Sequence, residues 1–179
     1  CAAKGKELDK KAKGLETERN RLLKQLEQCK TELTAANARY SNLPALTLLR
    51  ADKPLANSMG LAVIPDDDIH ALIQIVSVLS QRDNIQRLWE TLKNRCESDK
   101  RAATGDERLL LESALTWHNH NWSSLPYQLI LGAPSSRYDY QKQMRSRHIT
   151  KGETVAALLL PGIADGSGNV LCKALVLTK

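Results

Sequence analysis

The sequence predicts an α+β protein, in which an N-terminal coiled-coil helix precedes a small domain with helices packed on one face of a mainly antiparallel sheet. Three observations lead to this fold class. An unbroken heptad pattern runs from Leu8 to Tyr40. Helical periodicity fills the middle of the chain, and extended apolar runs separated by turn residues fill its last third.

The heptad pattern alternates spacings of four and three residues without a slip. The d positions are Leu8, Leu15, Leu22, Cys29 and Ala36, and the a positions are Ala12, Arg19, Leu26, Leu33 and Tyr40. We expect the seam to consist of Leu8, Leu15, Leu22, Leu26, Cys29 and Leu33. A helix of about 50 Å with so little apolar surface is not stable alone, so the pattern predicts a partner helix, and a homo-oligomer is the favoured arrangement.

Flanking charges favour parallel strands. In a parallel pair Lys11 would meet Glu16, and none of the remaining g–e pairs is repulsive. Arg19 at an a position and Gly14 weaken the N-terminal half, although a polar a residue also selects register. An antiparallel helix from its own domain or from another protein is the alternative, and the oligomer number stays open.

The helix is predicted to end near Pro44, because proline disfavours helical geometry in the residue before it. This divides the chain into residues 1–42, an anchor and coiled-coil rod, and residues 43–179, a globular domain. Residues 46–50 and 61–64 are interpreted as short strands. The three acids Asp66–Asp68 are interpreted as a helix start, and a divalent-cation site is the alternative.

Three helices are predicted next. Residues 69–79 are apolar nearly all round, which indicates a central, buried helix. A second, amphipathic helix buries one face, formed by Ile85, Leu88, Trp89, Leu92 and Cys96. A capping box from Thr104 to Glu107 opens the third, after a polar turn at residues 97–105.

Strands are predicted at residues 127–131, 154–160 and 170–177. Residues 165–169, with the sequence Asp-Gly-Ser-Gly-Asn, form a strong hairpin-type turn signal between the last two.

Composition limits the class of protein. No apolar run reaches the roughly 18–20 residues that a membrane span requires, and phenylalanine is absent from the 179 residues, so the core must be mostly aliphatic. The net charge is +6, of which +4 falls in residues 1–42 with ten Lys and Arg against six acids. A basic rod suits an anionic surface, although a solvated coiled-coil exterior is the favoured interpretation.

The sequence begins with Cys1, followed by the small residues Ala2 and Ala3 and a polar stretch from Lys4. In these residues it resembles the mature form of a bacterial lipoprotein. The resemblance implies an acylated Cys1 that anchors the protein to a membrane, and Ala2 in place of Asp implies the outer membrane, facing the periplasm. Several acyl chains would give a stable anchor, whereas one binds only marginally.

The other cysteines leave several arrangements open. Cys96 and Cys172 could pair in an oxidising periplasm, and Cys29 at a d position could form a disulfide with its copy across a parallel seam. Three buried reduced thiols are an equally good interpretation. No CxxC pair or zinc-ligand spacing occurs.

Signals for catalysis are sparse. His118 and His120, between Trp117 and Trp122, could bind zinc from a strand, because alternate strand side chains share a face. A third ligand would have to come from His70, His148 or Asp66–Asp68. The favoured alternative places both histidines on the surface at a helix end. Ser123 and Ser124 lie nearby, but no GxSxG or SxxK motif accompanies them, and we expect no cofactor.

Residues 135–151 have the strongest binding character in the domain. Five cations and two tyrosines stand there against one acid, Asp139. We expect the contact residues to be Arg137, Tyr138, Tyr140, Lys142, Arg145 and Arg147. Docking of a protein partner is favoured over a glycan, lipid or nucleic-acid ligand, and a solvated connection between strands is the alternative without a binding function.

These observations together predict a non-enzymatic envelope lipoprotein, which anchors and spaces a small binding domain as a structural component of a secretion, conjugation or pilus-type assembly. The expected partners are the membrane, through the lipid, and the proteins of that assembly. A cell-wall-acting envelope enzyme, metal-dependent through His118 and His120, is one alternative. A nucleic-acid-binding adaptor is the other.

Overall fold

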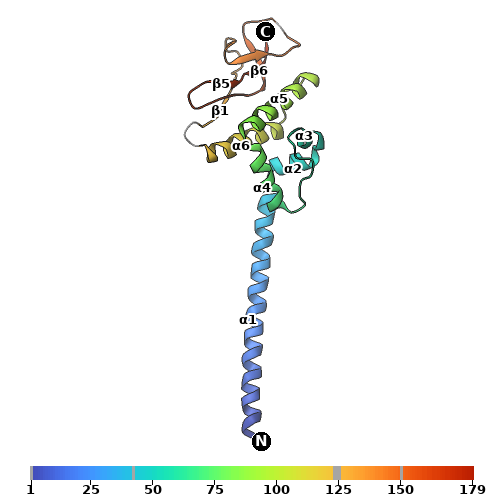
Figure 1. Ribbon diagram of the computed structural model, residues 1–179, viewed down its shortest axis with the longest axis vertical. Coiled ribbons are helices and arrows are strands. Elements are labelled where there is room, and N and C mark those ends of the chain that lie inside the picture. The colour runs from blue at the N-terminus through green and yellow to red at the C-terminus, as the bar shows by residue number, and fades with distance from the viewer. Residues whose placement is uncertain (1, 42, 123–125, 150) are drawn as a thin grey trace. The chain divides into compact units, whose positions relative to one another are not determined.

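The computed structural model describes residues 2–41, 43–122, 126–149 and 151–179, without the side chains of residues 2–10, 12 and 33–41. The chain divides into two compact units, Cys1–Ser41 and Asn42–Lys179 (Figure 1). The described residues combine six helices with two sheets of three strands, so the predicted mixture of helices and strands is confirmed.

The first unit is one continuous helix, α1 (Ala2–Ser41), of 40 residues, which confirms the helix that the heptads predicted. Its length corresponds to about 60 Å. The seam leucines are open to solvent, with exposed fractions of 72% for Leu15, 54% for Leu22 and 51% for Leu26. The seam positions Leu8 and Leu33 have side chains outside the described ones. Pairing with a second helix therefore stays a prediction.

The second unit opens with two short helices, α2 (Pro44–Ala51) and α3 (Lys53–Ser58), so the strand predicted at residues 46–50 is wrong. The alternation of Leu46 and Leu48 suggested a strand, but the buried residues of α2 are Ala45, Leu46 and Leu49, which share one helical face. The strand predicted at residues 61–64 is also wrong. This segment belongs to no sheet, with Leu61 buried and Val63 78% exposed.

The three longer helices agree with the predicted segments. They are α4 (Asp68–Leu79), α5 (Arg82–Ser98) and α6 (Gly105–Asn121). Asp67 caps α4 by accepting from the His70 N–H at 2.9 Å, and Thr104 with Glu107 completes the capping box of α6. The predicted burial of α4 on all sides is wrong, since Ile69 and Ile73 are 43% and 59% exposed. Glu97, placed in a polar turn by the sequence, is buried within α5.

The strands form two small sheets instead of the single sheet that the sequence predicted. The six strands are β1 (Gln128–Ile130), β2 (Gln143–Arg145), β3 (Val155–Leu160), β4 (Gly162–Ala164), β5 (Val170–Cys172) and β6 (Ala174–Thr178). One sheet has the order β1-β4-β5 and is antiparallel; in the other, β6 pairs antiparallel with β3 and parallel with β2. The predicted strand at 170–177 is divided at Lys173, where the chain passes from one sheet to the other. The turn at 165–169 does join an antiparallel pair, β4 and β5.

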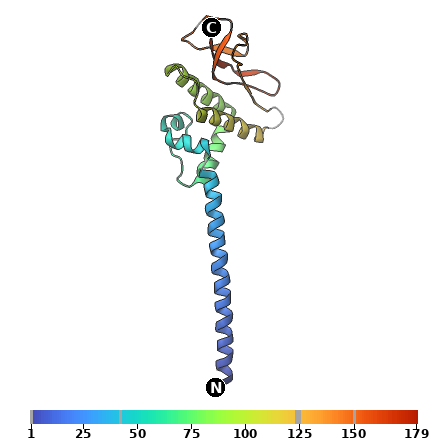
Figure 2. The same cartoon turned by 180° about the vertical axis from the view of Figure 1, so that it is seen from behind.

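Within residues 43–179, both views show the strands on one side of α5 and α6, with α2 and α3 on the other (Figures 1 and 2). The indole N–H of Trp89 on α5 donates to the Pro161 carbonyl at 2.7 Å, and the Ala103 N–H donates to Leu159 at 2.8 Å. Gly162 lets the strands approach closely, because a Cβ there would lie 2.5 Å from the Ala174 nitrogen. The buried core therefore extends from the helices into both sheets.

Candidate functional site

We define the 137–145 surface as the one formed by Arg137, Tyr138, Tyr140, Lys142 and Arg145. Sequence reasoning treated this segment as a connection, but it contains β2, whose partner β6 lies about 30 residues further along the chain. The sequence signal for the strand β2 was weak, because Gln143-Met144-Arg145 is short and polar. Pairing with β6 fixes the backbone from which these side chains project.

Two side chains of this surface, Arg145 and Tyr138, stack on each other. The Arg145 guanidinium lies over the Tyr138 ring at 4.1 Å and donates to the Gly152 carbonyl at 2.8 Å. The Tyr138 hydroxyl donates to the Gln143 carbonyl at 3.2 Å. The stacked pair forms one wall of a shallow pocket of about 300 Å³, which Arg137, Tyr140 and Glu153 complete.

The members free to contact a ligand are the outer ones. Tyr140 is 69% exposed, and Arg137 and Lys142 are also exposed. Lys173, which sequence reasoning missed, donates from Nζ to the Tyr140 carbonyl at 2.6 Å and adds a further cation. An exposed tyrosine among cations can bind an acidic or aromatic protein segment, because Tyr and Arg supply much of the energy at interfaces.

Arg147 is not part of this cluster. Its Nε lies 3.1 Å from the Glu97 carboxylate, and its backbone N–H donates to the same group. His148 donates from Nε2 to the Glu97 carbonyl at 2.7 Å. Glu97 is only 6% exposed, so Arg147 balances its buried charge while His148 satisfies its backbone carbonyl at the end of α5.

The structure separates His118 and His120. Both lie on α6, where residues two apart point to different sides, so they do not form the pair that a strand would have given. His118 is 5% exposed, which corrects its predicted surface position, whereas His120 is exposed. Ser123 and Ser124 lie outside the described residues.

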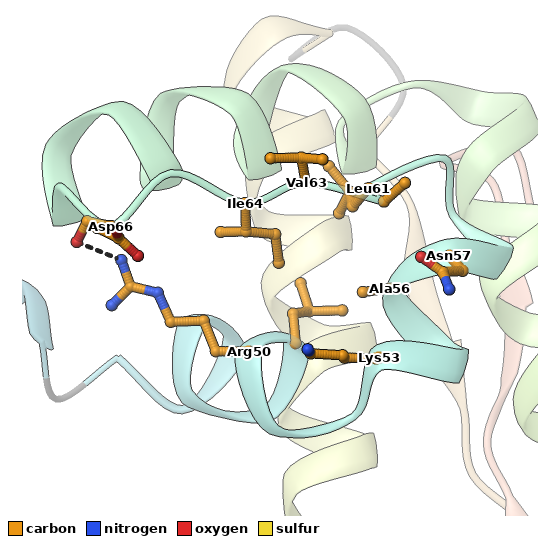
Figure 3. Close-up of a pocket in the computed structure, with 10 residues that line it drawn as sticks. Arg50, Lys53, Ala56, Asn57, Leu61, Val63, Ile64 and Asp66 are labelled. Carbon is orange, nitrogen blue, oxygen red and sulfur yellow. Dashed lines mark hydrogen bonds between the residues drawn. The ribbon is translucent and has the colours of Figure 1, made fainter.

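The three acids at 66–68 act at the start of α4. Hydrogen bonds from the His70 backbone and side chain lower the pKa of Asp67, the capping residue. Arg50 holds the preceding loop: it lies 2.5 Å from Asp68 Oδ1 and donates to the Pro65 carbonyl at 2.8 Å. It also donates to the Asp66 carbonyl at 2.8 Å, which is the hydrogen bond drawn in Figure 3.

A pocket of about 390 Å³ lies beneath this loop, against α2 and α3. Leu61 and Ile64 lie between the loop and these helices, and Lys53 and Asn57 stand at the side of α3 (Figure 3). Arg50 is already occupied by the loop, so the pocket offers few free polar groups in a convergent arrangement.

The three described cysteines are free thiols, so the disulfide considered between Cys96 and Cys172 is absent from the structure. Burial raises the pKa of each of these two thiols to about 11, which leaves them protonated and unreactive at neutral pH. Cys29 on α1 is exposed.

Within the described ranges, no three His, Cys, Asp or Glu side chains come together in an arrangement that could hold a metal ion. None of the described helices is both long and apolar enough to cross a membrane. Comparison with family models, with curated proteins and with solved structures found no match for this chain.

Proposed function

We propose that this chain is a non-enzymatic component of a protein assembly, in which α1 pairs with the α1 helix of a second copy and residues 43–179 bind a protein partner. The observation that carries this proposal is the apolar stripe on α1. Leu15, Leu22 and Leu26 lie at seam positions and each is more than half exposed in the single chain. An isolated helix gains little from its own side chains, so this stripe requires a second helix to cover it.

The test introduces charge into the seam. Leu22→Asp combined with Leu26→Asp would bury unpaired carboxylates beside their own copies, at a cost of several kcal/mol for the dimer. We expect wild type to sediment as an oligomer and the double variant as a monomer. Circular dichroism should show less helix in the variant, with residues 43–179 still folding.

The matched control adds the same charge to the opposite face. Gln28 and Thr31 occupy c and f positions and are exposed, so Gln28→Asp with Thr31→Asp should leave the oligomer intact. A wild type that stays monomeric at high concentration would overturn self-association and assign the stripe to a different protein.

The 137–145 surface supports the binding part of the proposal, because exposed Tyr140 stands there among Arg137, Lys142 and Lys173. An envelope location and an assembly of the secretion, conjugation or pilus type rest on the lipoprotein resemblance at Cys1, which lies outside the described residues. Membrane fractionation of the protein expressed from its natural gene, with and without Cys1→Ser, tests the proposed lipid anchor. If the variant associates with membranes as wild type does, the anchor at Cys1 is ruled out.

A further inference from the structure

A third pocket, of about 590 Å³, lies where α4 ends, α5 begins and α6 ends. Its volume falls within the roughly 300–1,000 Å³ of small-molecule sites. The lining consists of Ser77, Ser80, Gln81, Arg82, His118, Asn121 and Trp122. None of these residues belongs to the 137–145 surface or to the stripe on α1, so this pocket is a separate feature of the domain.

The ring of His118 is held in one orientation in this pocket. Its Nδ1 lies 2.7 Å from the Ser80 carbonyl oxygen, and its ring stacks on Tyr127 with centroids 4.2 Å apart. Because a carbonyl only accepts, Nδ1 carries a proton and donates it to this oxygen, which leaves Nε2 as the ring nitrogen that a ligand can contact. His118 is 5% exposed and belongs to the lining of the pocket. A ligand hydroxyl can pair with Nε2, because a hydroxyl both donates and accepts.

Trp122 supplies an apolar wall beside His118. It is 60% exposed, and its ring centroid lies 6.2 Å from that of His118 at an interplanar angle of 44°. A large aromatic face left in water gains free energy when a flat apolar surface covers it. The site therefore combines a ring face for stacking with the fixed ring of His118.

The remaining polar groups are mostly neutral. The Asn121 amide and the Ser77 hydroxyl can each donate and accept, while Gln81 already donates from Nε2 to the Ser77 carbonyl at 3.1 Å. Arg82 is the one charged residue among the described residues that line the pocket. The arrangement suits a ligand with a flat C–H face and a rim of hydroxyl groups.

We propose that this pocket binds a saccharide ring. The C–H face of the ring covers Trp122, one hydroxyl pairs with His118 Nε2, and others pair with Asn121 and Ser77. An acyl chain would leave these polar groups without partners. A nucleic-acid strand requires cations along its backbone, and Arg82 alone lines this pocket among the described residues. The site goes beyond the protein-binding role proposed above.

The experiment is isothermal titration calorimetry of the full chain with three soluble oligosaccharides and one oligonucleotide. The probes are cellohexaose, the hexamer of N-acetylglucosamine, hexagalacturonate and an oligothymidylate. We expect at least one oligosaccharide to bind, and Trp122→Ala to weaken it tenfold or more. Trp122→Phe, which keeps an aromatic face, should lose less. Arg82→Ala should weaken hexagalacturonate more than the uncharged oligosaccharides.

Asn121→Ala provides a second variant, because its exposed side chain can be removed without touching the core. It should weaken the same oligosaccharide while the unfolding temperature stays that of wild type. Tyr140→Ala is the control, since it removes an equally exposed aromatic ring elsewhere and should leave the affinity unchanged. The proposal is overturned if no oligosaccharide binds, if the oligonucleotide alone binds, or if both pocket variants bind like wild type.

Discussion

At the scale of single residues, Glu107 is the most constrained charged group of the domain. It is 3% exposed, and its carboxylate accepts from Arg101 at 2.6 and 2.9 Å and from the Thr104 N–H at 2.8 Å. Arg95 lies 3.6 Å away and also pairs with Asp52. This carboxylate therefore joins the start of α6, the end of α5 and the cap of α3.

Burial by itself would raise the pKa of Glu107, but the hydrogen bonds from Arg101 and Thr104, with the charges of both arginines, outweigh it and lower the pKa. A carboxylate with a lowered pKa in the folded state stabilises the fold above its unfolded pKa of about 4.3. We expect Glu107→Gln to lower the free energy of unfolding at pH 7 by about 1.5–3 kcal/mol. This difference should shrink as the pH falls below about 4.3, through the folded-state pKa.

Urea unfolding of both proteins between neutral and acid pH measures this difference. Glu112→Gln is the matched control, because Glu112 is exposed on the same helix and should change stability by less than about 0.5 kcal/mol. If both substitutions changed the free energy of unfolding equally at pH 7, the hydrogen bonds and ion pairs of Glu107 would contribute no more stability than an exposed glutamate on the same helix.

At the scale of helices and strands, the sequence predicted elements whose signals are local. The capping box at Thr104 and Glu107 located α6, and Asp67 located α4, because both caps use residues within one turn. The helix α2 was missed because it is only 8 residues long, too short for its helical periodicity to outweigh the alternation of Leu46 and Leu48.

The candidate site was less predictable than the helices, because distant partners form it. β2 exists through its pairing with β6, and the stack of Arg145 on Tyr138 follows from that pairing. The sequence predicted that Arg147 belongs to the same surface, because it is close to the other residues in the chain. Its carboxylate partner is instead Glu97 on α5. Likewise, the partner of His118 is the Ser80 carbonyl, 38 residues away, which no local pattern indicates.

The orientation of α1 in its expected dimer can be tested through Cys29, which is exposed at a d position. In a parallel pair the two thiols face each other, so diamide, which takes up the two electrons and two protons, should join the copies through a disulfide. The chain should carry Cys1→Ser for this test. Burial raises the pKa of Cys96 and Cys172 to about 11, so neither should react. A non-reducing gel measures the covalent dimer.

The control moves the thiol to the outer face of the helix. Cys29→Ser combined with Thr31→Cys places it at an f position, where parallel copies point apart, and it should give little covalent dimer. Similar yields from positions 29 and 31 would contradict the predicted parallel seam.

At the scale of the whole molecule, charge and apolar surface are distributed over different parts of the chain. The stripe on α1 is apolar within a basic helix, whereas the 137–145 surface joins cations to an exposed tyrosine. A protein with two such surfaces can connect a second copy of itself to a different partner. This combination is what we expect of an assembly component, because both surfaces offer contact area to other chains.

The most direct test of the proposed protein partner uses substitutions on the 137–145 surface. Arg137→Glu with Lys142→Glu reverses two exposed charges, and Tyr140→Ala removes the exposed ring, while the supporting pair of Tyr138 and Arg145 stays intact. We expect both variants to lose the same protein, at least tenfold, in a pull-down from envelope extract. Arg and Tyr at the centre of an interface each contribute about 2 kcal/mol or more.

Arg87→Glu provides the control, because Arg87 is exposed on α5 and does not line the pocket of the 137–145 surface. It should retain the partner, and all variants should keep the circular dichroism spectrum of wild type. If charge reversal alone abolishes binding and binding by wild type falls steeply with added salt, the ligand is a polyanion such as a phosphate-bearing polymer. If neither variant changes the captured protein, the cations and Tyr140 are a solvated surface, and the partner contacts another face of the domain.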